Sequence, residues 1–147
     1  DQGRKSQAAR VKALLESGQR VVAIDPFIFG ESKIKSRDFL HVLLVHAVGQ
    51  RALGIQSGQI AAVANWAKTE FQNPVQLTSV GPRLSVAARI AAVQTDAISS
   101  LNLYEPMKSL KSVVLENKGA NHLPEMMCFG LLEFFDLEDI ESLKAAK

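Results

Sequence analysis

The stretch from residue 75 to residue 93 constrains the fold of this chain more than any other. It begins with the apolar run VQLTSV, passes through a Gly-Pro turn and ends in the small-sided run SVAARIAAV. Alternating β-branched and polar residues predict a strand that ends at Val80. Gly81 and Pro82 predict a sharp turn, after which residues 85–93 form a helix. A helix with so little polar surface packs closely against a sheet, so we expect both elements to be buried.

Length and composition indicate a single domain, or a segment of one, over residues 1–147. Of the 147 residues, 47% are hydrophobic and 22% are charged, which is enough apolar material for one core. The 17 basic and 15 acidic residues give a formal net charge of +2, and the basic residues are dispersed, so we expect no nucleic-acid partner. No apolar run approaches the ~18 residues of a membrane span, so we expect no membrane partner.

The remaining sequence alternates between extended and helical patterns. The patterns predict three strands, over residues 20–26, 75–80 and 96–105. They predict helices over residues 6–17 (with Ser6 as N-cap), 54–71, 85–93 and 137–146, and a helix that begins at Pro124. Residues 38–51 fit either a buried helix or a strand, and we favour the helix. Residues 107–116 fit a short helix or an irregular crossover.

Strands that alternate with helices indicate βαβ units, right-handed crossovers and a parallel sheet. We therefore expect an α/β fold with three layers, α/β/α, around a short parallel sheet of about three strands. Ligand sites in such folds lie just outside the carboxyl ends of the strands. The turn over residues 81–85 is thus the first candidate for a functional site.

Three motifs resemble the acetyl xylan esterase-like branch of the α/β-hydrolase superfamily. Residues 21–32, VVAIDPFIFGES, resemble the family's D-x-R-G-x-G-E-S loop, although Phe27 and Ile28 replace its Arg and first Gly. Residues 49–54, GQRALG, and Trp66 are similar to its G-x-x-L-x-G and the helix that follows. Residues 124–136, which contain PEMMCFG and Phe-Asp, resemble the segment before the next core strand. The matching loop residues are Asp25, Gly30, Glu31 and Ser32.

The turn at Gly81 resembles the nucleophile elbow of that superfamily, G-x-S-x-G, in which the serine sits on a strained strand-to-helix turn. Gly81 matches the first Gly, Arg83 takes the place of the nucleophile, and Ser85 takes the place of the second Gly. A guanidinium stays protonated and does not attack a carbonyl. In that fold the acid, the histidine and the oxyanion loop would lie outside this stretch. The resemblance therefore implies a hydrolase-like segment that has no catalytic residue and is predicted to be inactive.

The resemblance also implies an incomplete sheet. In the family, the strand beside the elbow strand comes from an upstream part of the protein, so either the predicted strands pair directly or another chain or segment fills the gap. An open sheet edge and a dense apolar cluster favour self-association, or the remainder of a larger protein, as the partner. The cluster consists of Met126, Met127, Phe129, Phe134 and Phe135.

The serines and Asp25 are better explained by structural roles than by catalysis. Ser79 and Ser85 flank the turn, but neither occupies the exposed elbow position. Ser57 lies in GIQSG, which has the wrong spacing for an elbow and opens a helix. Asp25 ends a predicted strand, where an aspartate more often caps the following loop than performs chemistry.

The three histidines and the single cysteine indicate no metal or cofactor site. His41 and His46 lie five residues apart in an apolar run, which is not the spacing of a metal pair. His122 is a weak candidate for a general base, chosen by elimination, because no nucleophile stands ready for it. Cys128 is the only cysteine, which excludes a disulfide within the chain and a cysteine-based metal site.

A second hypothesis is a small anion- or nucleotide-binding Rossmann-like module that uses the helix start at residues 81–85. Backbone N–H groups at a helix N-terminus favour anions, and Arg83 would add a positive charge for a small anion. The competing interpretation, which we favour, is an arginine on the surface of a turn. The nucleotide motifs G-x-G-x-x-G and G-x-x-x-x-G-K-[ST] are both lacking from the sequence.

Overall fold

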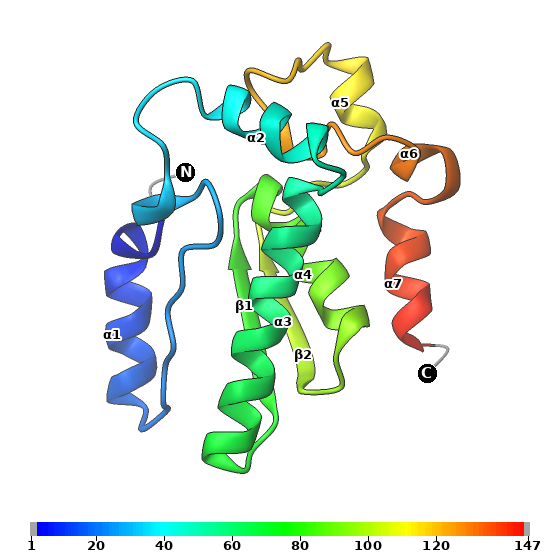
Figure 1. Ribbon diagram of the computed structural model, residues 1–147. Helices are drawn as coiled ribbons and strands as arrows, with labels where there is room; N and C mark the ends of the chain where they lie inside the picture. Colours follow the sequence, from blue (N-terminus) through cyan, green and yellow to red (C-terminus); the bar gives the residue numbers. More distant parts are fainter. Residues whose placement is uncertain (1–2, 146–147) are drawn as a thin grey trace.

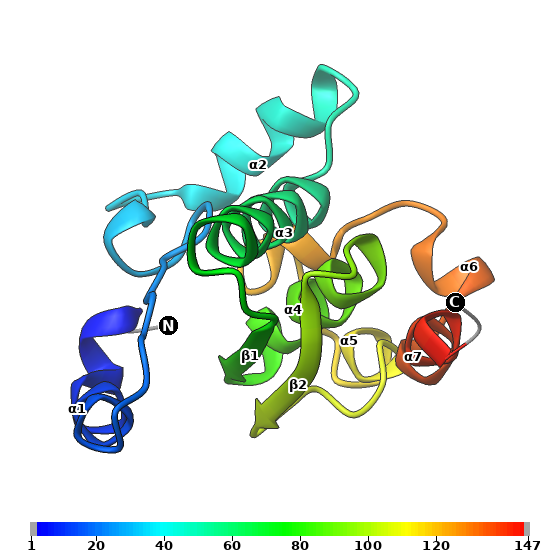
Figure 2. The same ribbon diagram turned by 90° about the horizontal axis from the view of Figure 1, so that it is seen from below.

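The computed structural model describes residues 3–145, which form an α/β fold around a short parallel sheet (Figure 1). Within these residues the sheet has two strands, β1 (Val75–Val80) and β2 (Ile98–Tyr104). Helix α4 (Pro82–Gln94) connects them as a βαβ unit, and helix α3 (Ala52–Phe71) leads into β1. Viewed from below, α3 and α4 lie on one side of the two strands and α1 lies on the other (Figure 2).

Shorter elements surround this central unit. They are η1 (Arg4–Gln7), α1 (Ala8–Glu16), η2 (Gly30–Ser32), α2 (Asp38–Ala47), α5 (Lys111–Leu115), η3 (Pro124–Met126), α6 (Leu131–Phe134) and α7 (Leu137–Ala145). The predicted helices over residues 6–17, 54–71, 85–93 and 137–146 are confirmed to within a few residues, and the segment over 38–51 is helical. Ser6 is not an N-cap, because it lies inside η1. No described helix is long and apolar enough to cross a membrane.

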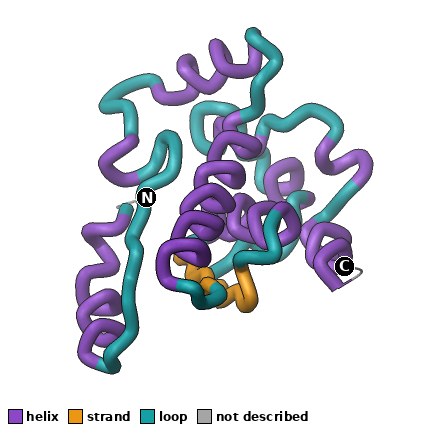
Figure 3. Tube along the Cα trace, turned by 60° about the horizontal axis from the view of Figure 1, so that its bottom comes forward, coloured by secondary structure: helices purple, strands orange, loops and turns teal. Residues whose placement is uncertain are grey.

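The prediction that residues 20–26 form a strand of the sheet is wrong. This segment is extended, but it pairs with neither β1 nor β2, and Val22 is 46% exposed. Both Figure 1 and Figure 3 draw it as a loop that stands apart from the strands. An apolar run predicts burial, whereas a strand also needs a partner backbone, and none lies next to this segment within the described residues.

The predicted helix from Pro124 through Leu132 is also wrong. The chain forms a single 3-10 turn over η3, leaves helical geometry at Met127, and becomes helical again only at Leu131. Gly130 has a φ of +79°, a left-handed conformation that interrupts a helix and favours glycine. The side chain of Glu125 points into the protein interior and is fully buried, which ties this turn to the core.

The core lies where α3, α4 and α7 meet the sheet. Fully buried Ala87 and Ala91 on α4 allow that helix to pack closely against its neighbours, and Ile98 of β2 is 1% exposed. The side chains that fill the space between the elements are Leu53 and Ile60 of α3, Val86 of α4, Met107, Leu110, Leu123, Met126, and Leu137 and Ile140 of α7.

Asp136 fixes the position of α7 relative to the loop before α5. One carboxylate oxygen accepts the backbone N–H groups of Leu110 and Leu137 at 2.7 and 2.8 Å, and the other accepts the hydroxyl of Ser109 at 2.6 Å. Burial acts to raise the pKa of this carboxyl group, but the three hydrogen bonds outweigh it and lower the pKa below its ordinary value. The carboxylate therefore caps the start of α7 in its charged form.

Replacing Leu53 by alanine tests the assignment of the core. We expect Leu53→Ala to lower the free energy of unfolding by about 2–5 kcal/mol, because it removes buried apolar surface and leaves a cavity. The matched control is Leu115→Ala, since Leu115 is 83% exposed whereas Leu53 is 2% exposed. For the control we expect a change within about 0.5 kcal/mol. Urea denaturation followed by circular dichroism measures both, and equal losses would contradict this core.

Candidate functional site

The turn between β1 and α4 has the conformation expected of a tight strand-to-helix connection. Gly81 has a φ of +94°, which favours glycine, and its N–H donates to the carbonyl of Tyr104 at 2.9 Å, so the turn is tied to the end of β2. Pro82 begins α4, where its missing N–H costs no helical hydrogen bond. Arg83 follows in the first turn of the helix, which begins three residues earlier than the predicted start at Ser85.

The expectation that Arg83 is a surface residue is wrong. Its side chain is only about 10% exposed and forms a two-pronged ion pair with Glu125, with Nε–Oε1 and Nη2–Oε2 distances of 2.5 and 2.7 Å. The guanidinium also stacks on the ring of Phe29, 4.6 Å from its centroid. Planar guanidinium and carboxylate groups match in this geometry, so the two buried charges compensate each other.

Glu125 is the residue that the sequence analysis missed. It lies forty-two positions after Arg83 and is 0% exposed. A single acidic residue between the apolar runs of residues 123–132 is unusual, because a buried carboxylate requires a partner. That pattern indicated that Glu125 has a cation nearby, although it did not indicate which one.

The serines near the turn are not arranged for nucleophilic catalysis. Ser85 is fully buried; its Oγ donates to the carbonyl of Pro82 at 2.7 Å and accepts the N–H of Met107 at 3.0 Å. Ser79 on β1 is 7% exposed, and its hydroxyl has no hydrogen-bond partner among the described residues. In residues 3–145 no hydrogen bond joins either hydroxyl to a histidine, which a serine nucleophile would need as its base.

The histidines lie on other parts of the molecule. His41 is exposed on α2, and His122 is exposed in the loop before η3, where its backbone N–H bonds to Gly119. His46 is half-buried near the end of α2, and its Nε2 has no partner among the described residues. Burial lowers the pKa of His46, and the positive charge of Arg51 lowers it further. The described residues contain no group of three potential ligands that could hold a metal ion.

Asp25 has the loop-capping role that the sequence predicted, whereas Ser57 is not at a helix start, because α3 begins five residues earlier at Ala52. The carboxylate of Asp25 accepts the backbone N–H groups of Arg4 and Glu31 at 2.7 and 3.0 Å, which closes the loop after the extended segment. Gly30 lies against this carboxylate so closely that an added Cβ would be 2.2 Å from its Cγ. Ser57 is buried inside α3 and donates to the carbonyl of Gly54 at 3.1 Å.

A large cavity lies between β1 and the N-terminal arm, which we define as residues 3–26. Its volume is about 990 Å³, and it is open to solvent at one side. One wall is the whole of β1, and the opposite wall is the extended segment over residues 18–26. Side chains of α3 and of α1 also line it, and Arg83 lines it near the turn.

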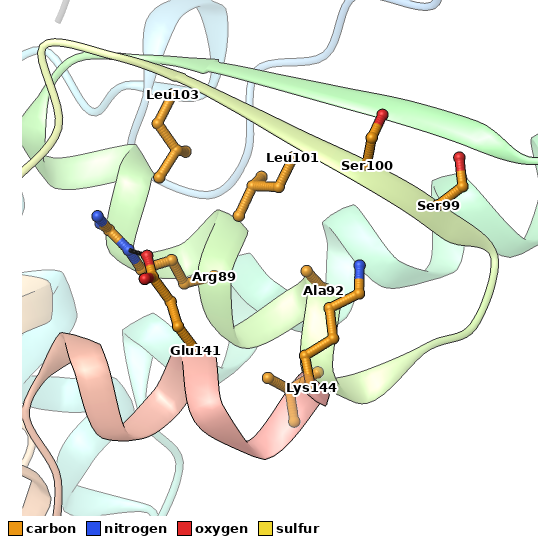
Figure 4. Close-up of a pocket in the computed structure, with 9 residues that line it drawn as sticks. Arg89, Ala92, Ser99, Ser100, Leu101, Leu103, Glu141 and Lys144 are labelled. Carbon is orange, nitrogen blue, oxygen red and sulfur yellow. Dashed lines mark hydrogen bonds and ion pairs between the residues drawn. The ribbon is translucent and has the colours of Figure 1, made fainter. Parts of the chain in front are cut away.

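A smaller cavity of about 340 Å³ lies on the other side of the molecule, where α4 and α7 meet β2 (Figure 4). Its charged groups are already engaged. Arg89 pairs with Glu141 at 2.5 Å and also donates to Ser85 Oγ, and Lys144 donates to the carbonyl of Ile98 at 2.8 Å. These contacts hold α7 against the outer edge of β2, so we assign this cavity a structural role.

Comparison with family models, with curated proteins and with solved structures found no match to this chain. Interpretation of the site therefore depends on its geometry and on the motifs of the sequence.

The Arg83–Glu125 pair makes a sharp prediction about stability. We expect Glu125→Gln to lower the free energy of unfolding by about 3–5 kcal/mol, because it removes the negative charge that compensates a buried guanidinium. The double variant Arg83→Met/Glu125→Leu should recover much of this loss, since it removes both charges at similar volume. Urea denaturation of the two variants and the parent measures the effect.

The matched control is Glu16→Gln, which removes an exposed i,i+4 pair with Lys12 whose atoms are 3.7 Å apart. Here we expect a change within about 0.5 kcal/mol. If Glu125→Gln lowered the free energy of unfolding by no more than Glu16→Gln does, the Arg83–Glu125 pair would not be what holds the turn against the core.

His46 predicts a pH dependence of stability. Because its pKa is lowered in the folded protein, the unfolded chain, whose histidine titrates near pH 6.5, binds the proton first as the pH falls. Stability from this group is therefore complete above about pH 6.5 and decreases below it. We expect His46→Leu to flatten the fall in unfolding free energy between about pH 7.5 and 5.5. The control His41→Leu, on the exposed side of the same helix, should leave that slope unchanged.

Proposed function

We propose that this chain is a non-catalytic, acetyl-xylan-esterase-like segment of the α/β-hydrolase type that serves a structural or binding role in a larger protein or assembly. The observation that carries the proposal is the ion pair between Arg83 and Glu125. Arg83 occupies the position of the nucleophile in the resembling motif, and its guanidinium is committed to a buried carboxylate. A guanidinium held in this way does not attack an ester. If it released Glu125, a buried charge would be left unpaired.

Three further features support an inactive segment. Ser85 uses its hydroxyl in hydrogen bonds within the core, so it is not available as a replacement nucleophile. His122 is exposed in the loop before η3, and no hydrogen bond joins it to a serine within the described chain. The cavity beside the turn is lined by β1 and the N-terminal arm rather than by an acid–histidine pair.

The alternative, an anion-binding module at residues 81–85, has less support from the geometry. An anion at the helix start would have to compete with Glu125 for the guanidinium of Arg83, which is already paired at 2.5 and 2.7 Å. Pro82 also removes one of the N–H groups that such a site uses. We therefore favour the structural or binding role.

An ester-hydrolysis assay tests the absence of catalysis. We expect no turnover of p-nitrophenyl acetate by the folded protein above that of the same protein unfolded in urea. Ser79→Ala is the critical variant, because Ser79 presents a buried hydroxyl without a partner on the cavity wall. Ser36→Ala, in an exposed loop, is the control. Turnover that Ser79→Ala abolishes and Ser36→Ala preserves would overturn the proposal.

A further inference from the structure

The cavity of about 990 Å³ separates two extended backbones that each lack a partner on the side facing it. One is the extended segment of the N-terminal arm: the backbone groups of residues 21–24 make no hydrogen bond to any other described residue. The other is the outer edge of β1. The two run in the same direction in Figure 1. Unpaired strand edges of this kind are templates for another strand.

The hydrogen-bonding groups on the outer edge of β1 can be assigned from its pairing with β2. The N–H of Gly81 donates to Tyr104 of β2, and Val75 at the other end of the strand likewise donates toward β2. Since backbone groups of successive strand residues point to alternate sides, the even-numbered residues direct their N–H and C=O groups into the cavity. These residues are Gln76, Thr78 and Val80.

Two apolar helix faces lie on either side of this gap. On one side, α3 contributes Ile60, Val63 and Ala67 to the lining. On the other side, α1 contributes Val11 and Leu14, although not one residue of that amphipathic helix is buried. The apolar stripe of α1 therefore lines the cavity and is only half-buried. An inserted strand would be covered on both faces, and strands in that position are apolar along their length.

The length of the cavity admits one strand. A strand of six residues is about 20 Å long. The cavity, of about 990 Å³, extends along all six residues of β1. A small ligand would leave most of the facing backbone groups unpaired, whereas a strand would satisfy both walls.

The charges on the lining indicate acidic groups at the ends of the occupant. Arg10 stacks on the ring of Tyr104 at 3.7 Å, near the end of β2, and Arg20 stacks on Phe71 at 4.9 Å, near the start of β1. Within residues 3–145 neither arginine has a carboxylate at ion-pair distance, and Nε of Arg10 is buried without an acceptor. The other two arginines of the lining, Arg4 and Arg83, are paired with Glu31 and Glu125, and exposed Glu105 adds one negative charge.

We propose that this cavity receives an extended strand of about six apolar residues from another polypeptide, with a carboxylate side chain at each end. The strand pairs with the outer edge of β1 and with the extended segment of the arm, and its carboxylates meet Arg10 and Arg20. This names the partner for the binding role proposed above and rests on that role. Residues 125–133 of this chain have a similar acidic-apolar-acidic pattern, but Glu125 is held by Arg83 in the folded protein, so a folded second copy does not supply them.

Binding of a defined peptide tests the proposal. The probe is a fluorescein-labelled peptide of sequence EVIVTVVD with a Gly-Ser tail, and its fluorescence anisotropy is measured during titration with the intact 147-residue chain. We expect saturable binding. Methylating alternate backbone nitrogens of the peptide removes the N–H donors along one of its edges, and this should abolish binding. Replacing the two acids by Gln and Asn should weaken binding by at least about tenfold, because hydrogen bonds to charged groups are lost.

Thr78 offers a matched pair of variants on the protein side. Thr78→Pro removes the N–H at the middle of the outer edge without removing a hydrogen bond to β2, and proline is tolerated at such edge positions. We expect it to keep the urea midpoint within a small shift and to weaken peptide binding by at least about tenfold. Thr78→Val changes the side chain but keeps the N–H, so it should bind like the parent.

Several results would overturn the proposal. The first is that the peptide shows no saturable binding. The second is that the N-methylated peptide binds as tightly as the unmodified one, and the third is that Thr78→Pro binds the peptide as tightly as the parent protein. If Thr78→Pro unfolds, the comparison of the two peptides on the parent protein decides. A parent dimer that excludes the peptide and becomes monomeric in Thr78→Pro would assign the cavity to a second copy instead. The ester assay separates this inference from the proposed function. If the protein hydrolyses the ester and also binds the peptide, only the absence of catalysis is overturned. If it neither hydrolyses the ester nor binds the peptide, only this inference is overturned.

Discussion

The buried ion pair between Arg83 and Glu125 is the interaction on which the rest of the structure depends. It joins the first turn of α4 to η3, two segments that are remote in sequence, and Phe29 covers the guanidinium from a third. Each charge is stable in the interior only because the other is present. The same pair ties the turn after Pro124 to the interior, and it commits the guanidinium in the first turn of α4 to a buried carboxylate.

The second constraint is the width of the sheet. Two parallel strands leave two open edges, and parallel sheets are normally wider and covered on both faces. On the side of β2, Lys144 of α7 donates to the carbonyl of Ile98, and the Arg89–Glu141 pair holds α7 to α4. On the side of β1 the equivalent place is a cavity bordered by an arm whose helix has no buried residue. The molecule is therefore well packed on one side and prepared for a further strand on the other.

These two constraints together favour binding over catalysis. Polar groups near the turn are used for internal structure: Ser85 bonds to Pro82 and Met107, Asp25 closes a loop, and Asp136 caps α7. Around the cavity, the groups without a partner among the described residues are the outer backbone edges, Nε of Arg10 and the hydroxyl of Ser79. Unpaired backbone recognises another backbone, which is the chemistry of strand addition rather than that of a small substrate.

The sequence by itself determined the elements whose signals are local: the periodic helices α3 and α4, and the strand β1 with its Gly-Pro turn. Only the tertiary structure decided which extended segments pair and which charges meet. Residues 20–26 have the composition of a buried strand, yet pairing requires a neighbouring backbone that no local pattern specifies. Arg83 was mistaken for a surface residue because its partner lies forty-two positions away. Contacts between distant residues depend on how the elements pack, and packing is a property of the whole fold.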